Sequence, residues 1–195
     1  MNKKIKTLVF LCIIVVILLG GNLAYNYLKT HFEPELQLDI ANVAPTTEES
    51  VASDYLARDF TVQDINGNEV TLSSQFGKPI VVNFWASWCP PCKEEMPAFE
   101  KIYQEMGDEI TFMMIDLVDG SRETIETGTA YITAEGYTFP VYFDITQEAA
   151  YTYKIASIPT TLFINANGEL VTNVIGSLDE ETLRKGLDLI HTSPL

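Results

Sequence analysis

The sequence contains few cysteines and histidines, the residues that bind zinc and copper in most protein sites. Among its 195 residues there are three cysteines and two histidines. Cys89 and Cys92 lie close together, but His31 and His191 lie far from them along the chain. A structural zinc site needs four cysteine or histidine ligands, and a copper chaperone would lack the same ligands here. We therefore expect neither a metal ion nor a cofactor in this protein.

Basic residues are also scarce. The chain has 12 lysines and arginines against 27 aspartates and glutamates, which gives a formal net charge of −15 at pH 7. Four of the lysines precede residue 30, so residues 30–195 carry a formal charge of −19. A surface of this sign repels phosphate groups, and nucleic acid is therefore not an expected partner. The acidity indicates a well-hydrated surface.

One long apolar run stands near the N-terminus. Leu8 to Leu19 is unbroken and follows three lysines, and Gly20 to Ala24 extends it with Asn22 as its one strongly polar residue. This pattern is typical of a signal peptide or a signal anchor. Cleavage after Ala24 would place Asn22 where a small residue belongs, which favours an uncleaved membrane anchor over residues 1–28. The lysines then predict a cytoplasmic N-terminus, a single membrane span and an extracytoplasmic remainder.

Residues 29–54 lack the periodicity of a helix or a strand. They contain Pro34, Pro45 and scattered acidic residues, a composition typical of a flexible acidic tether. The whole chain is long enough for one well-cored domain beside such an appendage. We therefore expect a single domain over residues 55–195, separated from the membrane by the tether.

The hydrophobic pattern of residues 55–195 predicts alternating strands and helices. Asn66 and Gly67 mark a hairpin turn between two short strands, and apolar residues recur at helical spacing after Cys92. This alternation favours an α/β domain with helices on both faces of its sheet. Further strands are expected at Ile80–Trp85, Ile110–Leu117, Pro140–Asp144, Thr160–Ile164 and Leu170–Ile175, and further helices at Arg122–Glu135, at Gln147–Tyr153 and from Asp179.

The motif Cys89-Pro90-Pro91-Cys92 lies between a predicted strand and a predicted helix. A thiol at a helix N-terminus lies at the positive end of the helix dipole, which favours its thiolate. Cys89 is therefore the expected attacking thiol, and Cys92 the thiol that resolves the mixed disulfide. If Cys89 is the N-cap, the two prolines follow without amide hydrogens, and the Cys92 N–H is the first local donor to the thiolate. With so few donors Cys89 should be only moderately acidic, as suits a reductant or an isomerase.

Two segments resemble the thioredoxin superfamily: WASWCPPCKEEMP at Trp85–Pro97 and SIPTTLFINANG at Ser157–Gly168. They are most similar to its TlpA/ResA-like branch of membrane-anchored, extracytoplasmic thiol-disulfide oxidoreductases. The resemblance runs from about residue 55 to residue 190. It implies a thioredoxin-like fold, in which a central mixed β-sheet is flanked by helices and preceded by an N-terminal hairpin.

The same resemblance implies an insertion and a substrate platform. Cys92 and Pro159 are 67 residues apart, more than in simple thioredoxins, and an added central helix and strand around Asp119–Phe143 would explain the surplus. Ile158–Pro159 is expected to be a cis peptide packed against the cysteine pair, with the Ile158 backbone available to a substrate strand. Trp88, Ile158 and Pro159 should together offer an apolar platform for an extended polypeptide.

The chain differs from thioredoxins in the residue that would move a proton at Cys92. Thioredoxins carry a buried aspartate at the position of Asn83. An asparagine does not titrate. ResA-like proteins have a glutamate on the active-site helix near the cysteines, and Glu95, six residues after Cys89, matches its place. Glu95 is therefore the expected proton acceptor for Cys92, with Glu94 as its control. The alternative is that Glu95 is a solvated helix carboxylate without a catalytic role.

The expected function is thiol-disulfide exchange with protein substrates, as a reductant and as a monomer. A disulfide-forming oxidase or isomerase of the same fold, and a non-catalytic binding module with a static disulfide, are the alternatives. A peroxidase would need a nucleophilic cysteine in a motif of its own. The resemblance implies possible partners, because members of the branch reduce apocytochrome c or supply electrons to methionine sulfoxide reductases. A membrane thiol reductase would return the electrons.

Overall fold

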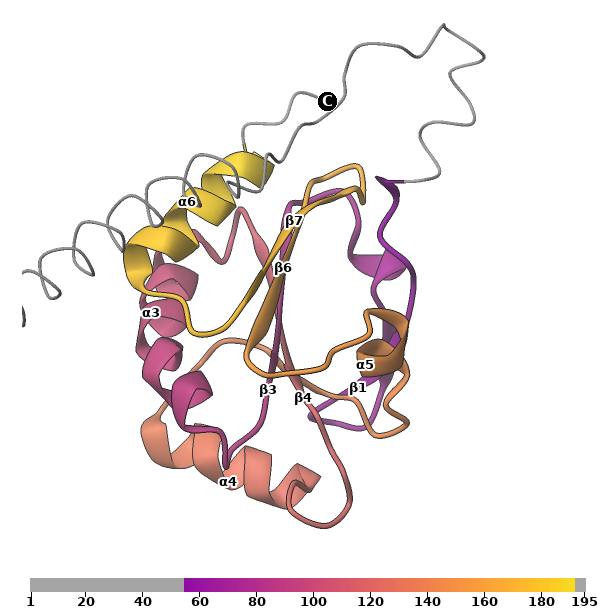
Figure 1. The fold of residues 1–195 in the computed structure, drawn as a ribbon, viewed down its shortest axis with the longest axis vertical. Helices are drawn as coiled ribbons and strands as arrows, with labels where there is room; N and C mark the ends of the chain where they lie inside the picture. The colour runs from indigo at the N-terminus through magenta and orange to yellow at the C-terminus, as the bar shows by residue number, and fades with distance from the viewer. Residues whose placement is uncertain (1–54, 192–195) are drawn as a thin grey trace, which may run out of the picture. The chain divides into compact units, whose positions relative to one another are not determined.

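The computed structural model describes residues 55–191. A seven-stranded mixed β-sheet has the strand order β2-β1-β5-β4-β3-β6-β7. β3, β4 and β5 are parallel neighbours, and the other strands join through antiparallel pairs. Figure 1 shows α3 and α6 on one side of this sheet and α5 on the other. The elements are β1 (Thr61–Asp64), β2 (Glu69–Thr71), the 3-10 helix η1 (Ser73–Gln75), β3 (Ile80–Trp85), α3 (Pro90–Met106), β4 (Thr111–Asp116), α4 (Ile125–Glu135), β5 (Val141–Phe143), α5 (Glu148–Thr152), β6 (Thr160–Ile164), β7 (Leu170–Ile175) and α6 (Glu180–His191).

The central strand β3 positions the cysteine motif. Every residue of β3 is buried, between the parallel neighbour β4 and the antiparallel neighbour β6. Val81 and Trp85 pack into the core that contains residues of α3 and α6, whereas Val82 and Phe84 pack into the core on the other face. Because side chains alternate between the two faces of a strand, Asn83 shares the α3 face with Val81 and Trp85. A polar side chain is thereby buried directly beneath the helix that carries the cysteines.

Four residues separate the end of β3 from the start of helix α3, and the last of them, Cys89, is the N-cap. Its buried side chains are spaced three and four residues apart, which places them on one face of the helix. Most of them are apolar, but the set also includes a carboxyl group. The buried residues are Cys92, Glu95, Met96, Phe99 and Ile102.

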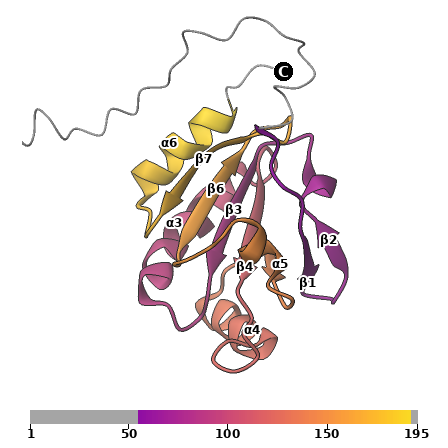
Figure 2. The ribbon, with the colours of Figure 1, turned by 45° about the vertical axis from the view of Figure 1, so that its right-hand side comes forward.

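The predicted α/β architecture is confirmed, and β3, β6 and β7 have the predicted bounds. The predicted hairpin is the antiparallel pair of β1 and β2 at one edge of the sheet, seen beside α5 in Figure 2. The helix and strand expected in the insertion are α4 and β5.

Helix α4 starts at Ile125, later than the predicted start at Arg122. Thr124 caps the helix: its Oγ1 accepts a hydrogen bond from Thr127 N at 3.2 Å, and Thr127 Oγ1 accepts one from Thr124 N at 2.8 Å. The three preceding amides donate instead to the carboxylate of Asp119. A local side-chain acceptor has therefore replaced the first turn of the expected helix.

The predicted membrane anchor over residues 1–28 and the predicted tether over residues 29–54 lie outside the described residues. Within residues 55–191 none of the helices has the length and apolar character needed to span a bilayer.

Candidate active site

The cysteine pair lies at the first turn of α3. Cys89 and Cys92 form a disulfide with a Cα–Cα distance of 5.3 Å. Pro90 and Pro91 occupy the first two helical positions, and Cys89 Sγ accepts a hydrogen bond from Cys92 N at 3.3 Å. The predicted N-cap arrangement, with the Cys92 N–H as the local backbone donor, is confirmed. Cys89 is 2% exposed and Cys92 is fully buried, so a substrate sulfur must approach from the side of Cys89.

The segment before β6 lies against this turn. The Ile158–Pro159 peptide is cis, as expected. The carbonyl oxygen of Ile158 lies 3.8 Å from Cys89 Sγ; because the disulfide sulfur carries no hydrogen, this is a van der Waals contact. The backbone of Ile158 therefore lies next to Cys89 Sγ, the sulfur expected to exchange a disulfide with the substrate.

A groove of about 460 Å³ opens beside Cys89, and it is largely apolar in its lining. Trp88 is 37% exposed on this surface. Of the three platform residues expected from the sequence, Trp88 and Ile158 line the groove, while Pro159 is buried and does not line it. Trp85 is fully buried in the core, as predicted. The lining residues are Trp88, Cys89, Pro90, Pro91, Leu117, Asp119, Gln147, Ala150, Ile155, Ala156, Ser157 and Ile158.

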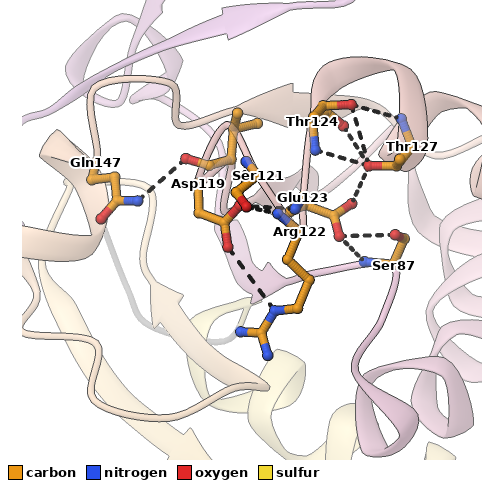
Figure 3. A network of polar contacts seen from close by, with 9 residues as sticks. Ser87, Asp119, Ser121, Arg122, Glu123, Thr124, Thr127 and Gln147 are labelled. Carbon is orange, nitrogen blue, oxygen red and sulfur yellow. Dashed lines mark hydrogen bonds and ion pairs between the residues drawn. The ribbon is translucent and has the colours of Figure 1, made fainter.

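We call residues 86–92, which join β3 to the first turn of α3 and carry both cysteines, the active turn. The loop between β4 and α4, residues 117–124, supports Trp88 in this turn. The guanidinium carbon of Arg122 lies 3.4 Å from the centroid of the Trp88 ring, a cation–π contact worth about 0.5 to 1 kcal/mol at an exposed site. Asp119 Oδ1 orders this loop by accepting hydrogen bonds from three successive backbone amides, which belong to residues 121–123 (Figure 3). The loop thereby places Arg122 over the Trp88 ring.

Glu123 holds the start of the active turn. Its Oε2 accepts hydrogen bonds from the backbone N of Ser87 at 3.0 Å and from the Ser87 hydroxyl at 2.8 Å (Figure 3). Ser87 lies two residues before Cys89, and Glu123 is fully buried. A buried carboxylate that accepts a hydrogen bond from a backbone amide restricts the position of that amide. The path of the chain between β3 and Cys89 is thus set by a residue from the loop that precedes α4.

A second carboxyl group, that of Asp116 at the end of β4, is buried beside Glu123. A Cβ added at Gly128 would overlap Asp116 Oδ2 and lie 3.4 Å from Glu123 Oε1, so both carboxyl groups sit over this glycine. Neither Asp116 oxygen accepts a hydrogen bond from a donor within residues 55–191. Burial, together with the adjacent Glu123 carboxyl, raises the pKa of Asp116 to about 9. Asp116 is therefore protonated at neutral pH and can donate its proton to Glu123.

Glu95 lies on the buried face of α3, three residues after Cys92, and is 1% exposed, so the alternative of a solvated helix carboxylate is wrong. Its Oε1 accepts a hydrogen bond from Asn83 Nδ2 at 2.7 Å, and its Oε2 accepts one from Leu178 N at 2.8 Å. Asn83 Nδ2 also donates to Thr161 Oγ1 at 3.0 Å. Burial raises the pKa of Glu95 to about 7, although the two hydrogen bonds act in the opposite direction. This carboxyl group can both accept and release a proton near neutral pH.

Sequence reasoning does not find the residues that support the active turn. Asp116 offers a weak signal, since it is a lone carboxylate within an apolar strand and such a residue is either at the strand end or buried. Glu123 and Arg122 offer none, because polar residues in a loop ordinarily face water. Their role depends on a contact with Ser87 and Trp88, more than 30 residues earlier in the chain.

Comparison with known protein families shows which family the chain belongs to. The model of the family described as AhpC/TSA matches residues 54–172, which is more than half of the chain. The chain belongs to the AhpC/TSA family.

Individual relatives of this AhpC/TSA member define its chemistry further. It is 27% identical over 176 residues to the thioredoxin-like protein YneN of Bacillus subtilis, covering 90% of this chain and 95% of YneN. It is 29% identical over 151 residues to the thiol-disulfide oxidoreductase ResA of the same organism, covering 77% of this chain and 83% of ResA. The crystal structure of StoA from Bacillus subtilis matches with a TM-score of 0.58 and 29% identity, covering 68% of this chain and 98% of StoA. The protein is a thiol-disulfide oxidoreductase of the ResA and StoA type, with the thioredoxin-like fold expected from its sequence.

The protonated Asp116 generates a prediction about stability. In the unfolded chain Asp116 ionises near pH 4, whereas in the fold it keeps its proton until about pH 9. The folded state therefore loses stability relative to the unfolded state as pH rises from about 4 to about 9. In the Asp116→Asn variant an amide can donate to Glu123 without this cost. We expect its free energy of unfolding at pH 7 to exceed that of the unmodified protein by about 1 kcal/mol or more.

The measurement is urea unfolding of the full chain between pH 5 and pH 8, with Asp108→Asn, at an exposed position, as the matched control. The gain from Asp116→Asn should grow with pH, while the control should show no such trend. A loss of stability in Asp116→Asn that is equal at all these pH values would contradict the shared proton.

Proposed function

We propose that this protein is an extracytoplasmic reductant of protein disulfides, anchored in the membrane by residues 1–28 and extended from it by the tether of residues 29–54. The observation that supports the reductive direction is the single local backbone donor to Cys89 Sγ, the Cys92 N–H. A strongly oxidising protein of this chemistry owes its potential to a stabilised thiolate in its reduced form. Pro90 and Pro91 remove two amides that could supply that stabilisation.

The reaction begins at Cys89. Its thiolate attacks one sulfur of the substrate disulfide, forms a mixed disulfide and releases the other substrate sulfur as a thiolate. The Cys92 thiolate then attacks Cys89 Sγ, releases the second substrate sulfur and closes the Cys89–Cys92 disulfide. Two electrons pass from the protein to the substrate. The cycle needs a thiol reductant to reopen the disulfide, and we assign that step to a membrane thiol reductase.

Glu95 manages the proton in this scheme. Cys92 and Glu95 are both buried and stand three residues apart on α3, which brings them to the same face of the helix. The Cys92 thiol must lose its proton before it can attack. Because Cys92 is fully buried, it cannot give this proton directly to water. A carboxylate with a pKa of about 7 is matched to that transfer.

The groove beside Cys89 is the proposed binding site for an extended polypeptide. Trp88 and Ile158 supply its apolar walls, the Ile158 backbone lies next to Cys89, and buried Pro159 supports Ile158. The substrate class is therefore a protein thiol or disulfide, for which an apocytochrome c or a methionine sulfoxide reductase are two candidates. We further propose that the protein acts as a monomer.

The weak thiolate support of Cys89 predicts its acidity. We expect the pKa of the Cys89 thiol to lie above the range of the strongly oxidising enzymes. The rate of iodoacetamide labelling of Cys89 against pH, followed at the peptide level in reduced full-length protein, measures it. A Cys12→Ser background removes the remaining thiol outside the motif. A Cys89 pKa below about 5 would falsify the reductive assignment and favour an oxidase.

The proton-transfer role of Glu95 predicts which step a substitution slows. In Glu95→Gln the release of substrate from the Cys89 mixed disulfide should slow by about tenfold or more near pH 7, because the resolving thiol loses its base. Single-turnover kinetics separate this step from the attack of Cys89. Glu94→Gln, at the exposed neighbouring position, is the control. An equal rate of release in both variants would show that Glu95 has no part in resolution.

A further inference from the structure

A second hollow on the described surface lies beside α5. It has a volume of about 1130 Å³ and adjoins the groove at Cys89, since Gln147, Ala150 and Ile155 line both. Figures 1 and 2 show α5 on the face of the sheet away from α3 and α6. A polypeptide that leaves the Cys89 groove along α5 therefore enters this second hollow, which we call the α5 hollow. Its lining residues are Arg58, Asp59, Thr146, Gln147, Glu148, Ala150, Tyr151, Thr152, Lys154 and Ile155.

The α5 hollow is lined by two cationic side chains that form no ion pair within residues 55–191. Residues 55–191 contain eight lysines and arginines against 21 aspartates and glutamates. The side chains of Arg58 and Lys154 make no hydrogen bond, ion pair or ring contact with any other residue in that range, although both line the hollow. The other six are engaged: Lys78 with the Asp108 carbonyl, Lys93 with the Tyr131 ring, Lys101 with Glu180, Arg122 with Asp119 and Trp88, Arg184 with Glu105 and Glu180, and Lys185 with Glu181.

The backbone of the α5 hollow is also unusual. Gln147 and Lys154, on either side of α5, are the two non-glycine residues with positive φ in the described part of the chain, at 58° and 51°. Such conformations cost energy and gather at functional surfaces. Between them Tyr151 is 86% exposed, a large aromatic side chain left facing solvent on the wall of the hollow.

The carboxylates of the hollow do not neutralise its cations. Asp59 Oδ1 accepts hydrogen bonds from the Phe60 and Ser73 amides, and its Oδ2 accepts one from the Ser73 hydroxyl. Glu148, which also lines the hollow, forms no ion pair with Arg58 or Lys154. The two cations are therefore available to a carboxylate from outside, on a domain whose charge repels carboxylates elsewhere.

We propose that the α5 hollow binds an acidic segment of the protein substrate while the substrate's disulfide lies at Cys89. This inference rests on the proposed function and narrows its substrates to polypeptides that carry carboxylates at a short distance from the reacting cysteine. Arg58 and Lys154 pair with the carboxylates, and Tyr151 offers an aromatic surface to the adjoining side chains. The pairing selects substrates and orients them, as charge complementarity does at other interfaces.

The test uses synthetic peptides with one cysteine in a mixed disulfide with 2-mercaptoethanol. Each carries three glutamates or three glutamines, separated from the cysteine by spacers of increasing length. Reduction is measured with full-length protein and with the double variant Arg58→Gln/Lys154→Gln. At the best spacer the ratio of KM for the glutamate peptide to KM for the glutamine peptide should rise about five- to tenfold in the double variant.

A second double variant, Lys101→Gln/Lys185→Gln, changes the net charge equally at cations that are paired elsewhere. Its KM ratio should stay within about twofold of the unmodified protein, since only the long-range field has changed. Equal ratios in the two double variants would overturn the α5 hollow as a docking site. In Glu148→Gln, which removes a repelling carboxylate from the wall, the ratio should instead fall.

Two further measurements separate failure of this inference from failure of the proposed function. If the protein reduces bis(2-hydroxyethyl) disulfide and the peptides without any dependence on Arg58 and Lys154, the function stands and the docking site is wrong. If it reduces no disulfide, the function is wrong, and docking is then judged by fluorescence anisotropy with labelled peptides in which serine replaces cysteine. The glutamate peptide must bind the unmodified protein more tightly than the Arg58/Lys154 double variant, and equal binding would overturn the inference.

Discussion

The hydrogen bonds that Glu95 accepts from Asn83 and Leu178 are the constraint on which the active site depends. A carboxyl group buried without partners would cost several kcal/mol, so the fold must bring donors to it. Asn83 comes from β3 and also bonds Thr161 on β6, while Leu178 comes from the segment between β7 and α6. Glu95 thereby ties the helix of the cysteines directly to two other parts of the fold, and through Asn83 to β6. The same burial raises its pKa to about 7 and makes it chemically useful.

The active turn is thus supported by carboxyl groups on two sides. Glu95 lies on the buried face of α3 with Cys92, and Glu123 holds Ser87 ahead of Cys89. Asp116, buried against Glu123, lowers the stability of the fold at neutral pH, since the folded state must retain a proton that the unfolded chain releases. Buried titratable groups of this kind are characteristic of functional sites, where stability is given up for position and proton affinity.

Much of this architecture is predictable from sequence because its signals are local. The apolar segments that became β3, β6 and β7 are bounded by turn residues, and the two prolines after Cys89 determine which amide faces its sulfur. Glu95 could be found because it matches the place of the glutamate that ResA-like proteins carry on the active-site helix. The hydrogen bonds between Ser87 and Glu123 and the contact of Arg122 with the Trp88 ring could not be found from the sequence. Each joins residues far apart in the chain, and the loop that supplies Arg122 and Glu123 has the composition of an ordinary polar surface. The position of Pro159, buried and outside the groove lining, likewise depends on packing.

Glu95, buried on α3 three residues after Cys92, is expected to exchange a proton near neutral pH. Carbon-13 NMR of the full-length protein, labelled at the glutamate side-chain carboxyl carbons, measures this directly, and the spectrum of Glu95→Gln assigns the resonance. We expect Glu95 to titrate with a midpoint near pH 7, well above the ordinary range of a glutamate carboxyl. A Glu95 midpoint below about pH 5 would contradict it, because such a group has no proton affinity to offer Cys92 at neutral pH.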